Sequence, residues 1–325
     1  MNVKTYLKNG LLFTRVSNNK NLTVYFCSLG ASIFQINYDR YVLTRNVYDL
    51  VDFKKGDIYY GKTIGRTVNR FRGNKLKYKN EIFEVRPNEG NNTLHGGLDS
   101  LSNQVFDILT LVKDEYIDVI YSKRVLESED HFLGDVDIKI TYRVHLNSNE
   151  LDVIYEGTGD SDYLLSLTNH SYFTLGNKSL EGLKLEINAS HYLKTDESLL
   201  PLSKDEVTKE LDFRQSKRIN KDINSFKTER MNGYDHYFYF DEVDISRRNI
   251  CLSNSKFDLE IYTDFEGVQI YTSGFSLPVD LYPKCDKTFD SIAIEPGDSY
   301  LKIRANRKGS LYNRTIKYLF INKDE

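Results

Sequence analysis

The sequence predicts an all-β protein, a sandwich or barrel of antiparallel strands. Composition is the first reason: the 325 residues include 24 Tyr and 18 Phe but no Trp. Aromatic residues, together with the many Val, Ile and Thr, favour half-buried pleated surfaces over helices. The second reason is alternation. In "DIKITYRVHL", residues 137–146, apolar side chains occupy every second position, which predicts a strand with one buried face.

Short runs of the same kind recur along the whole chain. Clusters of Asn, Gly, Asp and Ser separate them, for example "NSNE" and "GNKSLEG", and this spacing is typical of antiparallel sandwiches and barrels. The further runs that predict strands are "LTVYFCSL", "EIFEVRP", "QVFDILTLV", "YIDVIYSKRV", "LDVIYEGTG", "LKLEINAS", "HYFYF", "FDLEIYTD" and "GVQIYTSGF".

One segment, "SKDEVTKELDF" from Ser203 to Phe213, predicts a short peripheral helix. Ser203 is a suitable N-cap, and Glu206 three residues later completes a capping box. The chain has no linker-like stretch and no obvious internal repeat. Residues 1–325 are therefore expected to form a single domain rather than two.

Charge and cysteine content limit the class of protein. The 44 basic and 47 acidic residues give a formal net charge of -3, so a nucleic-acid partner is not expected. Cys27, Cys251 and Cys285 are odd in number and widely spaced, which favours neither a disulfide framework nor a zinc site. The first residues contain only a three-residue apolar run, so we expect a cytoplasmic protein without membrane contact.

Two histidines have unusual surroundings. His170 lies in "SLTNHSYFTLGN", where apolar residues flank a polar core, and a buried imidazole needs partners for both ring nitrogens. Its neighbours Asn169 and Ser171 either hold a core histidine or orient a proton donor that works near neutral pH. His95 lies in "NEGNNTLHGG", a composition suited to a tight loop that a ligand approaches closely.

Charged residues at strand ends extend the set of candidates. Asp235 opens the aromatic run "DHYFYF", and Glu295 ends an apolar run at a Pro-Gly turn, positions where side chains reach a cleft from a rigid support. The segment "GKTIGRTVNRFRGNKLKY" contains Arg66, Arg70 and Arg72 but matches neither glycine-rich phosphate motif. An arginine fork there suits sugar hydroxyls instead.

Together these pieces resemble the aldose 1-epimerase (mutarotase) family. The resemblance rests on six motifs in the family's order, spread over most of the chain: "GRTVNR" (65–70), "NNTLHGG" (91–97), "TNHSYFTL" (168–175), "GYDH" (233–236), "GVQIYTSGF" (267–275) and "IEP" (294–296). It implies the family's fold, a large antiparallel β-sandwich of the galactose mutarotase-like supersandwich type with an open carbohydrate cleft.

The resemblance also implies roles for eight residues. His170 would be the general acid and Glu295 the general base. The residues that would assist at the ring oxygen, hold hydroxyls or line the site are His95, Arg70, Asp235, Gln269, Asn69 and Tyr172. No metal or other cofactor is expected, and the partner would be a small aldose sugar bound by a monomer or homodimer.

The implied reaction explains these residue types. Exchange of α and β anomers needs one proton to leave the C1 hydroxyl and another to reach the ring oxygen, so that the ring opens and recloses. A carboxylate and an imidazolium supply both transfers, each contributing ~10²–10⁴-fold. Glu295 is expected to be ionised and His170 protonated near pH 7, with a bell-shaped pH profile.

Three alternatives remain open from the sequence. One is a carbohydrate-binding protein without catalysis, and another is a glycoside hydrolase that uses Asp235 and Glu295 as its carboxylate pair. The third is a hexose-phosphate 1-epimerase in which Arg66 and Arg72 meet the phosphate. The segment "EPGDSY", residues 295–300, departs from the family's pattern after the base, so the rim of the site is expected to differ. The resemblance implies galactose and glucose as substrates, and this departure leaves the preference between sugars open.

Overall fold

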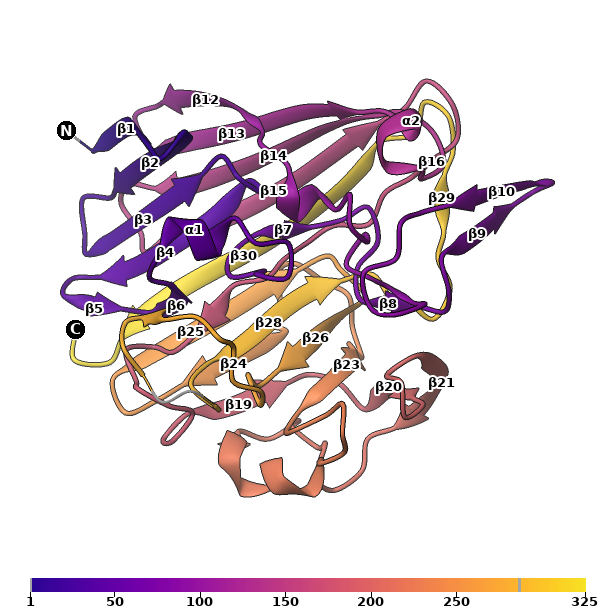
Figure 1. The fold of residues 1–325 in the computed structure, drawn as a ribbon. Coiled ribbons are helices and arrows are strands. Elements are labelled where there is room, and N and C mark those ends of the chain that lie inside the picture. Colours follow the sequence, from indigo (N-terminus) through magenta and orange to yellow (C-terminus); the bar gives the residue numbers. More distant parts are fainter. Residues whose placement is uncertain (1, 286–287) are drawn as a thin grey trace.

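A nine-stranded antiparallel sheet is the largest element of the fold. The computed structural model describes residues 2–285 and 288–325 (Figure 1). The strands of this sheet follow the order β12-β13-β14-β15-β30-β25-β24-β19-β22. Their bounds are β12 (Asp107–Val112), β13 (Tyr116–Val125), β14 (Val136–His145), β15 (Glu150–Thr158), β19 (Lys184–Ile187), β22 (Lys217–Arg218), β24 (Ile250–Ser253), β25 (Phe257–Thr263) and β30 (Tyr312–Asn322).

Two further antiparallel sheets pack against it. A five-stranded sheet comprises β1 (Val3–Lys8), β2 (Leu11–Ser17), β3 (Leu22–Cys27), β4 (Ser32–Tyr38) and β5 (Tyr41–Val42). An eight-stranded sheet, in the order β21-β20-β23-β26-β28-β18-β6-β27, comprises β6 (Thr44–Val47), β18 (Tyr172–Phe173), β20 (His191–Thr195), β21 (Pro201–Glu206), β23 (Asp235–Tyr239), β26 (Gly267–Tyr271), β27 (Leu281–Tyr282) and β28 (Ile292–Gly297).

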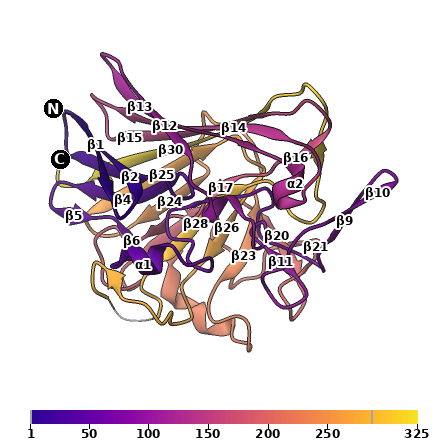
Figure 2. The same cartoon turned by 45° about the horizontal axis from the view of Figure 1, so that its top comes forward.

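Short pieces connect and border these sheets. Four two-stranded ladders comprise β7 (Thr63–Ile64), β8 (Arg70–Phe71), β9 (Lys75–Tyr78), β10 (Glu81–Glu84), β11 (Thr93–Leu94), β16 (Tyr163–Leu164), β17 (Thr168–Asn169) and β29 (Ala305–Asn306). Figures 1 and 2 show the β9–β10 hairpin projecting from the body. The helical turns are α1 (Leu50–Phe53), α2 (Glu127–Asp130), η1 (Leu101–Asn103), η2 (Ile219–Lys221) and η3 (Ile223–Ser225). None of these helices is long and apolar enough to cross a membrane.

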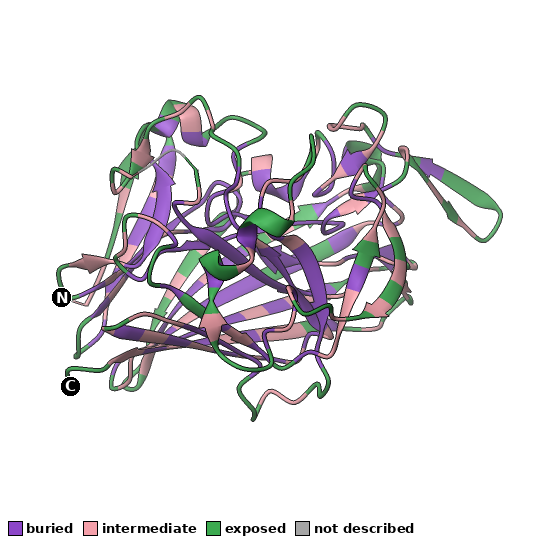
Figure 3. Ribbon diagram, turned by 90° about the horizontal axis from the view of Figure 1, so that it is seen from below, coloured by how far each residue is buried: buried purple, intermediate pink, exposed green. Residues whose placement is uncertain are grey.

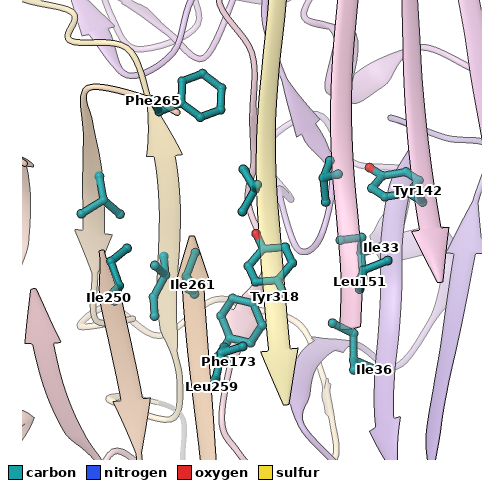
Figure 4. Close-up of a cluster of buried hydrophobic side chains, with 14 of the residues drawn as sticks. Ile33, Ile36, Tyr142, Leu151, Phe173, Ile250, Leu259, Ile261, Phe265 and Tyr318 are labelled. Carbon is teal, nitrogen blue, oxygen red and sulfur yellow. The ribbon is translucent and has the colours of Figure 1, made fainter. Parts of the chain in front are cut away.

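Aromatic contacts join the three sheets into one core. Phe173 of the eight-stranded sheet meets Tyr318 of the nine-stranded sheet, with ring centroids 5.6 Å apart (Figure 4). Phe26 of the five-stranded sheet stacks on Tyr142 at 4.9 Å. Both smaller sheets therefore bury apolar faces against the larger one, and Figure 3 shows buried residues concentrated on the strands while exposed residues follow many of the loops and edges. The predicted all-β sandwich is confirmed.

The alternation in residues 137–146 corresponds to β14, where Ile138, Ile140 and Val144 are buried while Asp137 and Lys139 are exposed. Each of the other runs that predict strands contains a strand of the structure. The pattern is reliable here because one face of each long strand must bury its side chains in the core.

The predicted helix at 203–213 is wrong. Residues 201–206 form β21, which pairs with β20 and places Leu193 opposite Lys204, and residues 207–213 contain no helix. Ser203 does not cap a helix, because its hydroxyl donates to the Asp205 carboxylate at 2.6 Å. The ladder with β20 supplies backbone hydrogen bonds that a short exposed helix could not match, so tertiary pairing outweighs local propensity.

Candidate active site

One cleft, with a volume of about 190 Å³, gathers all eight residues to which the sequence assigns a role. Four come from the eight-stranded sheet, two from the loops beside β8 and β11, one from β8 itself and one from the turn between β17 and β18. These parts are far apart in the chain. The cleft therefore exists only when several sheets have assembled, although each contributor is recognisable alone.

The register of β23, β26 and β28 aligns three of these side chains. Gln269 of β26 lies opposite Glu295 of β28. Asp235 of β23 lies opposite Tyr271, two residues further along β26 from Gln269. Because residues two apart on a strand share a face, the three side chains point into the same cleft. Gln269 joins the set by donating from Nε2 to Asp235 Oδ1 at 2.5 Å.

His170 and Tyr172 both line the cleft, whereas Asn169 and Ser171 do not. The imidazole stacks on the ring of Tyr172, with centroids 4.9 Å apart and planes at 25°, and on the ring of Tyr59 at 5.7 Å. His170 and Tyr172 are two residues apart, and side chains at this spacing in an extended chain point to the same side. The ring orientation therefore depends on aromatic packing.

One interpretation of the sequence was that Asn169 and Ser171 orient the imidazole of His170. The structure contradicts it. Ser171 Oγ donates to Asn169 Oδ1 at 2.5 Å, and Asn169 Nδ2 donates to the Gly61 carbonyl at 2.8 Å. The backbone fixes the position of His170 instead: its N–H donates to Lys62 O, and its carbonyl accepts from Gly61 N.

The central contact of the cleft joins His170 Nε2 and Glu295 Oε1 at 3.3 Å. The two side chains are only 4% and 2% exposed. Burial lowers the pKa of His170 to about 3, and burial, with the nearby charge of Asp235, raises the pKa of Glu295 well above its ordinary value. Both shifts favour one proton shared in a neutral pair over the separated charges expected from the sequence.

His95 and Asn69 form a reciprocal contact beside this pair. The Asn69 N–H donates to His95 Nδ1 at 3.3 Å, and the His95 N–H donates to Asn69 O at 3.0 Å. Since Nδ1 accepts, a neutral His95 carries its proton on Nε2. Burial lowers the pKa of His95 well below its ordinary value, and the neighbouring His170 and Arg70 add to this effect. His95 is thus a neutral hydrogen-bond donor.

Arg70 is held between two acids. Its Nε donates to both carboxylate oxygens of Glu89, at 3.1 and 2.9 Å, and its Nη1 lies 3.7 Å from Asp235 Oδ2. Burial raises the pKa of Asp235, while Arg70 and Gln269 act in the opposite direction. Glu89 was not predicted from the sequence, although it lies in the same "NEGNNTLHGG" segment as His95.

Arg66 and Arg72 do not line the cleft, contrary to what the sugar-phosphate alternative requires. Arg66 is buried beside Asp130 at 3.3 Å and donates to the carbonyls of Leu133 and Gly134. Arg72 is exposed and pairs with Asp196 at 2.8 Å. Of the three arginines only Arg70 lies in β8, while Arg66 precedes that strand and Arg72 follows it. No regular periodicity therefore fixes the directions of Arg66 and Arg72, and the sequence could not distinguish them.

Several further residues lining the cleft were missed by the sequence analysis. Two end strands, Leu94 of β11 and Tyr271 of β26. The others lie in loops whose path depends on the fold, namely Asp57, Tyr59, Tyr60, Arg230, Ser273, Phe275 and Leu277. Of these, Tyr271, Ser273 and Phe275 lie in the quoted motif "GVQIYTSGF". They alternate with buried core residues in that motif, and this alternation is the signal that could have found them.

The chemistry of the cluster suits proton transfer or metal ligation. His95, His170 and Glu295 each offer one ligand-type atom, and these atoms lie within 4.8 Å of one another. Neutral imidazoles and a carboxylate are common zinc ligands. The same three groups, arranged around one shared proton, are also a complete acid–base set.

Fold and site together define a β-sandwich protein with an acid–base pair in a polar cleft. The family model described as aldose 1-epimerase matches residues 14–318. The chain therefore belongs to the aldose 1-epimerase family, as the motifs in the sequence indicated.

Curated relatives agree with this assignment, and a solved structure shares the fold. An aldose 1-epimerase from Haemophilus influenzae is 29% identical over 225 residues, which cover 67% of this chain and 64% of that protein. A galactose mutarotase from Homo sapiens is 26% identical over 282 residues, covering 74% of this chain and 76% of that protein. A galactose 1-epimerase structure from Lactobacillus acidophilus superposes with a TM-score of 0.86 at 24% identity, covering 99% and 98% of the two chains. This last likeness shows the shared fold.

Proposed function

We propose that the protein is an aldose 1-epimerase, which interconverts the α and β anomers of free hexoses, with galactose and glucose as substrates. The observation that carries the proposal is the 3.3 Å contact between His170 Nε2 and Glu295 Oε1 inside the cleft. Membership of the family supports it. An isomerisation of this kind needs one acid and one base close together and no net proton change.

The shared proton accounts for both halves of the reaction. When it lies on His170, Glu295 is a carboxylate that accepts the proton of the C1 hydroxyl, and the imidazolium donates to the ring oxygen. The ring opens to the aldehyde, C1 rotates and the ring recloses with the transfers reversed. Moving the proton from Glu295 to His170 changes no proton count, so the active form stays accessible at neutral pH.

The other residues of the cleft bind and orient the sugar. His95, a neutral donor at Nε2, assists at the ring oxygen. Arg70, Asp235 and Gln269 form a connected polar set that holds hydroxyl groups, because carboxylate and amide oxygens accept from them while guanidinium groups donate. Asn69 and Tyr172 complete the wall.

Polarimetry of freshly dissolved α-galactose tests the proposal. Wild-type protein should accelerate the approach to anomeric equilibrium, and His170→Ala and Glu295→Gln should each reduce the catalysed rate by ~10²–10⁴-fold. His191→Gln is a matched control, since His191 bonds to Ser190 outside the cleft and should keep full activity. A wild-type protein that leaves the spontaneous rate unchanged would be a sugar-binding protein instead.

Substrate class and cellular setting complete the proposal. A free sugar is favoured over a sugar phosphate because Arg66 and Arg72 are engaged outside the cleft. A glycoside hydrolase is disfavoured because the two carboxylates have other partners: Glu295 contacts His170, and Asp235 is bound by Gln269 and lies beside Arg70. We expect a cytoplasmic, single-domain protein that acts as a monomer or homodimer, which sedimentation would determine.

A further inference from the structure

A second polar cavity borders the catalytic cleft. Its volume is about 260 Å³, compared with about 190 Å³ for the cleft. The two are built from adjoining residues: Thr67 and Val68 line the cavity while Asn69 lines the cleft, and Asp298 lines the cavity while Glu295 lines the cleft. At ~30 Å³ for each water, the cavity has room for roughly nine waters, which is the scale of one sugar ring.

The segment that departs from the family's pattern forms one wall of this cavity. Residues 298–306, which begin within "EPGDSY", all line it except Leu301. The function proposed for the cleft uses Glu295 but none of these residues. Because the residues that differ from the family's pattern line a cavity and do not only form a tight turn, this difference points to a role for the cavity itself.

The buried part of the wall carries hydrogen-bonding groups that the fold leaves incompletely used. The hydroxyls of Thr67 and Ser166 are buried and have no hydrogen-bond partner among the described residues. Arg314 donates to Oδ1 of Asp298 at 3.2 Å, and the Ser299 N–H donates to Oε1 of Glu266 at 2.5 Å. Each of these bonds uses one carboxylate oxygen, and a carboxylate accepts at two.

Tyr300 provides an aromatic boundary between the cavity and the cleft. It lines the cavity and is 7% exposed. The charges of Asp235 and Arg70 in the cleft both act on its hydroxyl, so it lies close to both sites. An aromatic ring beside acceptors and hydroxyls provides an apolar surface and a polar tip for one ligand.

We propose that this cavity is a second binding site for an uncharged polyhydroxylated molecule of about one sugar ring. Hydroxyl donors match the free oxygens of Glu266 and Asp298. An anion is disfavoured there because Arg314 in the same wall is already paired with Asp298, Glu266 keeps its negative charge, and Lys302 and Arg304 are exposed at the rim. The site needs no anomeric carbon and is independent of turnover in the cleft.

Calorimetric titration with myo-inositol tests this site, because myo-inositol has ring hydroxyls but no anomeric centre to react. Wild-type protein should bind it saturably, and Asp235→Asn, a change confined to the cleft, should bind it with unchanged affinity. Glu266→Gln should weaken binding by about tenfold or more through loss of a charged acceptor. Its mutarotation rate should equal that of wild type, which also shows that it folds.

Thr67→Val is a second variant that keeps side-chain shape and removes a hydroxyl. It should weaken myo-inositol binding several-fold without lowering thermal stability, since the hydroxyl has no partner to lose. Binding that disappears in Asp235→Asn but persists in both cavity variants would assign myo-inositol to the cleft and overturn the proposal. Absence of saturable binding to wild type would also overturn it, and neither result bears on the activity proposed for the cleft.

Discussion

Glu89 binds the Nε of Arg70 through both of its carboxylate oxygens, at 3.1 and 2.9 Å. The guanidinium then lies with Nη1 3.7 Å from Asp235. Arg70 is 15% exposed and Glu89 23%, so water screens this contact only in part. Glu89 does not itself line the cleft, and its two hydrogen bonds determine the direction in which the guanidinium points.

Glu89→Gln should therefore raise KM several-fold while kcat falls much less. The amide cannot match the two charge-assisted bonds, so Arg70 becomes mobile and sugar binding weakens, but the proton-transfer pair is untouched. Steady-state polarimetry over a range of galactose concentrations separates the two constants. Glu84→Gln, on the exposed β10 strand with 59% of its side chain accessible, should behave as wild type. A fall in kcat with KM unchanged would show that Glu89 does not act through binding.

Activity should show a broad plateau in pH. The pair formed by His170 and Glu295 is competent while it holds one proton. As pH falls it gains a second proton on His170, whose pKa burial lowers to about 3. As pH rises it loses its last proton from Glu295, whose pKa burial raises. The acid limb of kcat/KM should thus lie well below pH 6.5, the ordinary range of histidine.

The pH profile has a direct control. His145 lies outside the cleft, and its hydrogen bond to Asp152 raises its pKa. His145→Asn should therefore leave both limbs in place, with circular dichroism confirming the fold at each pH. An acid limb centred near 6.5 in wild type would mean that His170 titrates as a solvated imidazole, contrary to its burial.

Gly96→Ala should destabilise the protein and disturb His95. A Cβ at Gly96 would lie 2.2 Å from the carbonyl oxygen of Gly65, and the backbone there has φ of +88°. Gly90→Ala is a matched control, with φ of +61° and nothing within 4 Å of its Cβ. Urea denaturation should give a loss of ~1–2 kcal/mol for Gly90→Ala from backbone strain alone. Gly96→Ala should lose more than ~3 kcal/mol, and equal losses would show that the close approach is not restrictive.

Phe173→Ala should weaken the joint between two sheets. Its ring is fully buried against Tyr318, and truncation of a core Phe costs ~3–5 kcal/mol. The unfolding midpoint in urea should fall accordingly. Leu109→Ala, at a position 56% exposed on β12, should change stability by less than ~0.5 kcal/mol. A small effect of Phe173→Ala would show that the sheets repack around the space it leaves.

Much of the fold was predictable because strand periodicity is a local property. The alternation of Ile138, Ile140 and Val144 reports the buried face of β14 without reference to any partner. The segment after Pro201 shows the limit of such reasoning. Its residues suit a capped helix, but pairing with β20 makes it a strand, and that pairing is a long-range property of the assembled sheet.

The amino-acid sequence by itself indicated which residues belong to the candidate site. Motifs dispersed from Asn69 to Glu295 identified eight side chains, and all eight line one cleft. Residue type carries this information because acid–base and hydroxyl-binding chemistry each require particular groups.

Only the tertiary structure decided how those residues act. Arg66 and Arg72 form ion pairs outside the cleft. Asn169 and Ser171 bond to each other and not to the imidazole of His170. Glu89 binds Arg70, a contact that the sequence did not indicate. The tertiary structure also buries His170 and Glu295 together, which favours a shared proton over separated charges. Orientation, burial and pKa depend on neighbours brought from distant parts of the chain, and only the packed sheets bring those neighbours together.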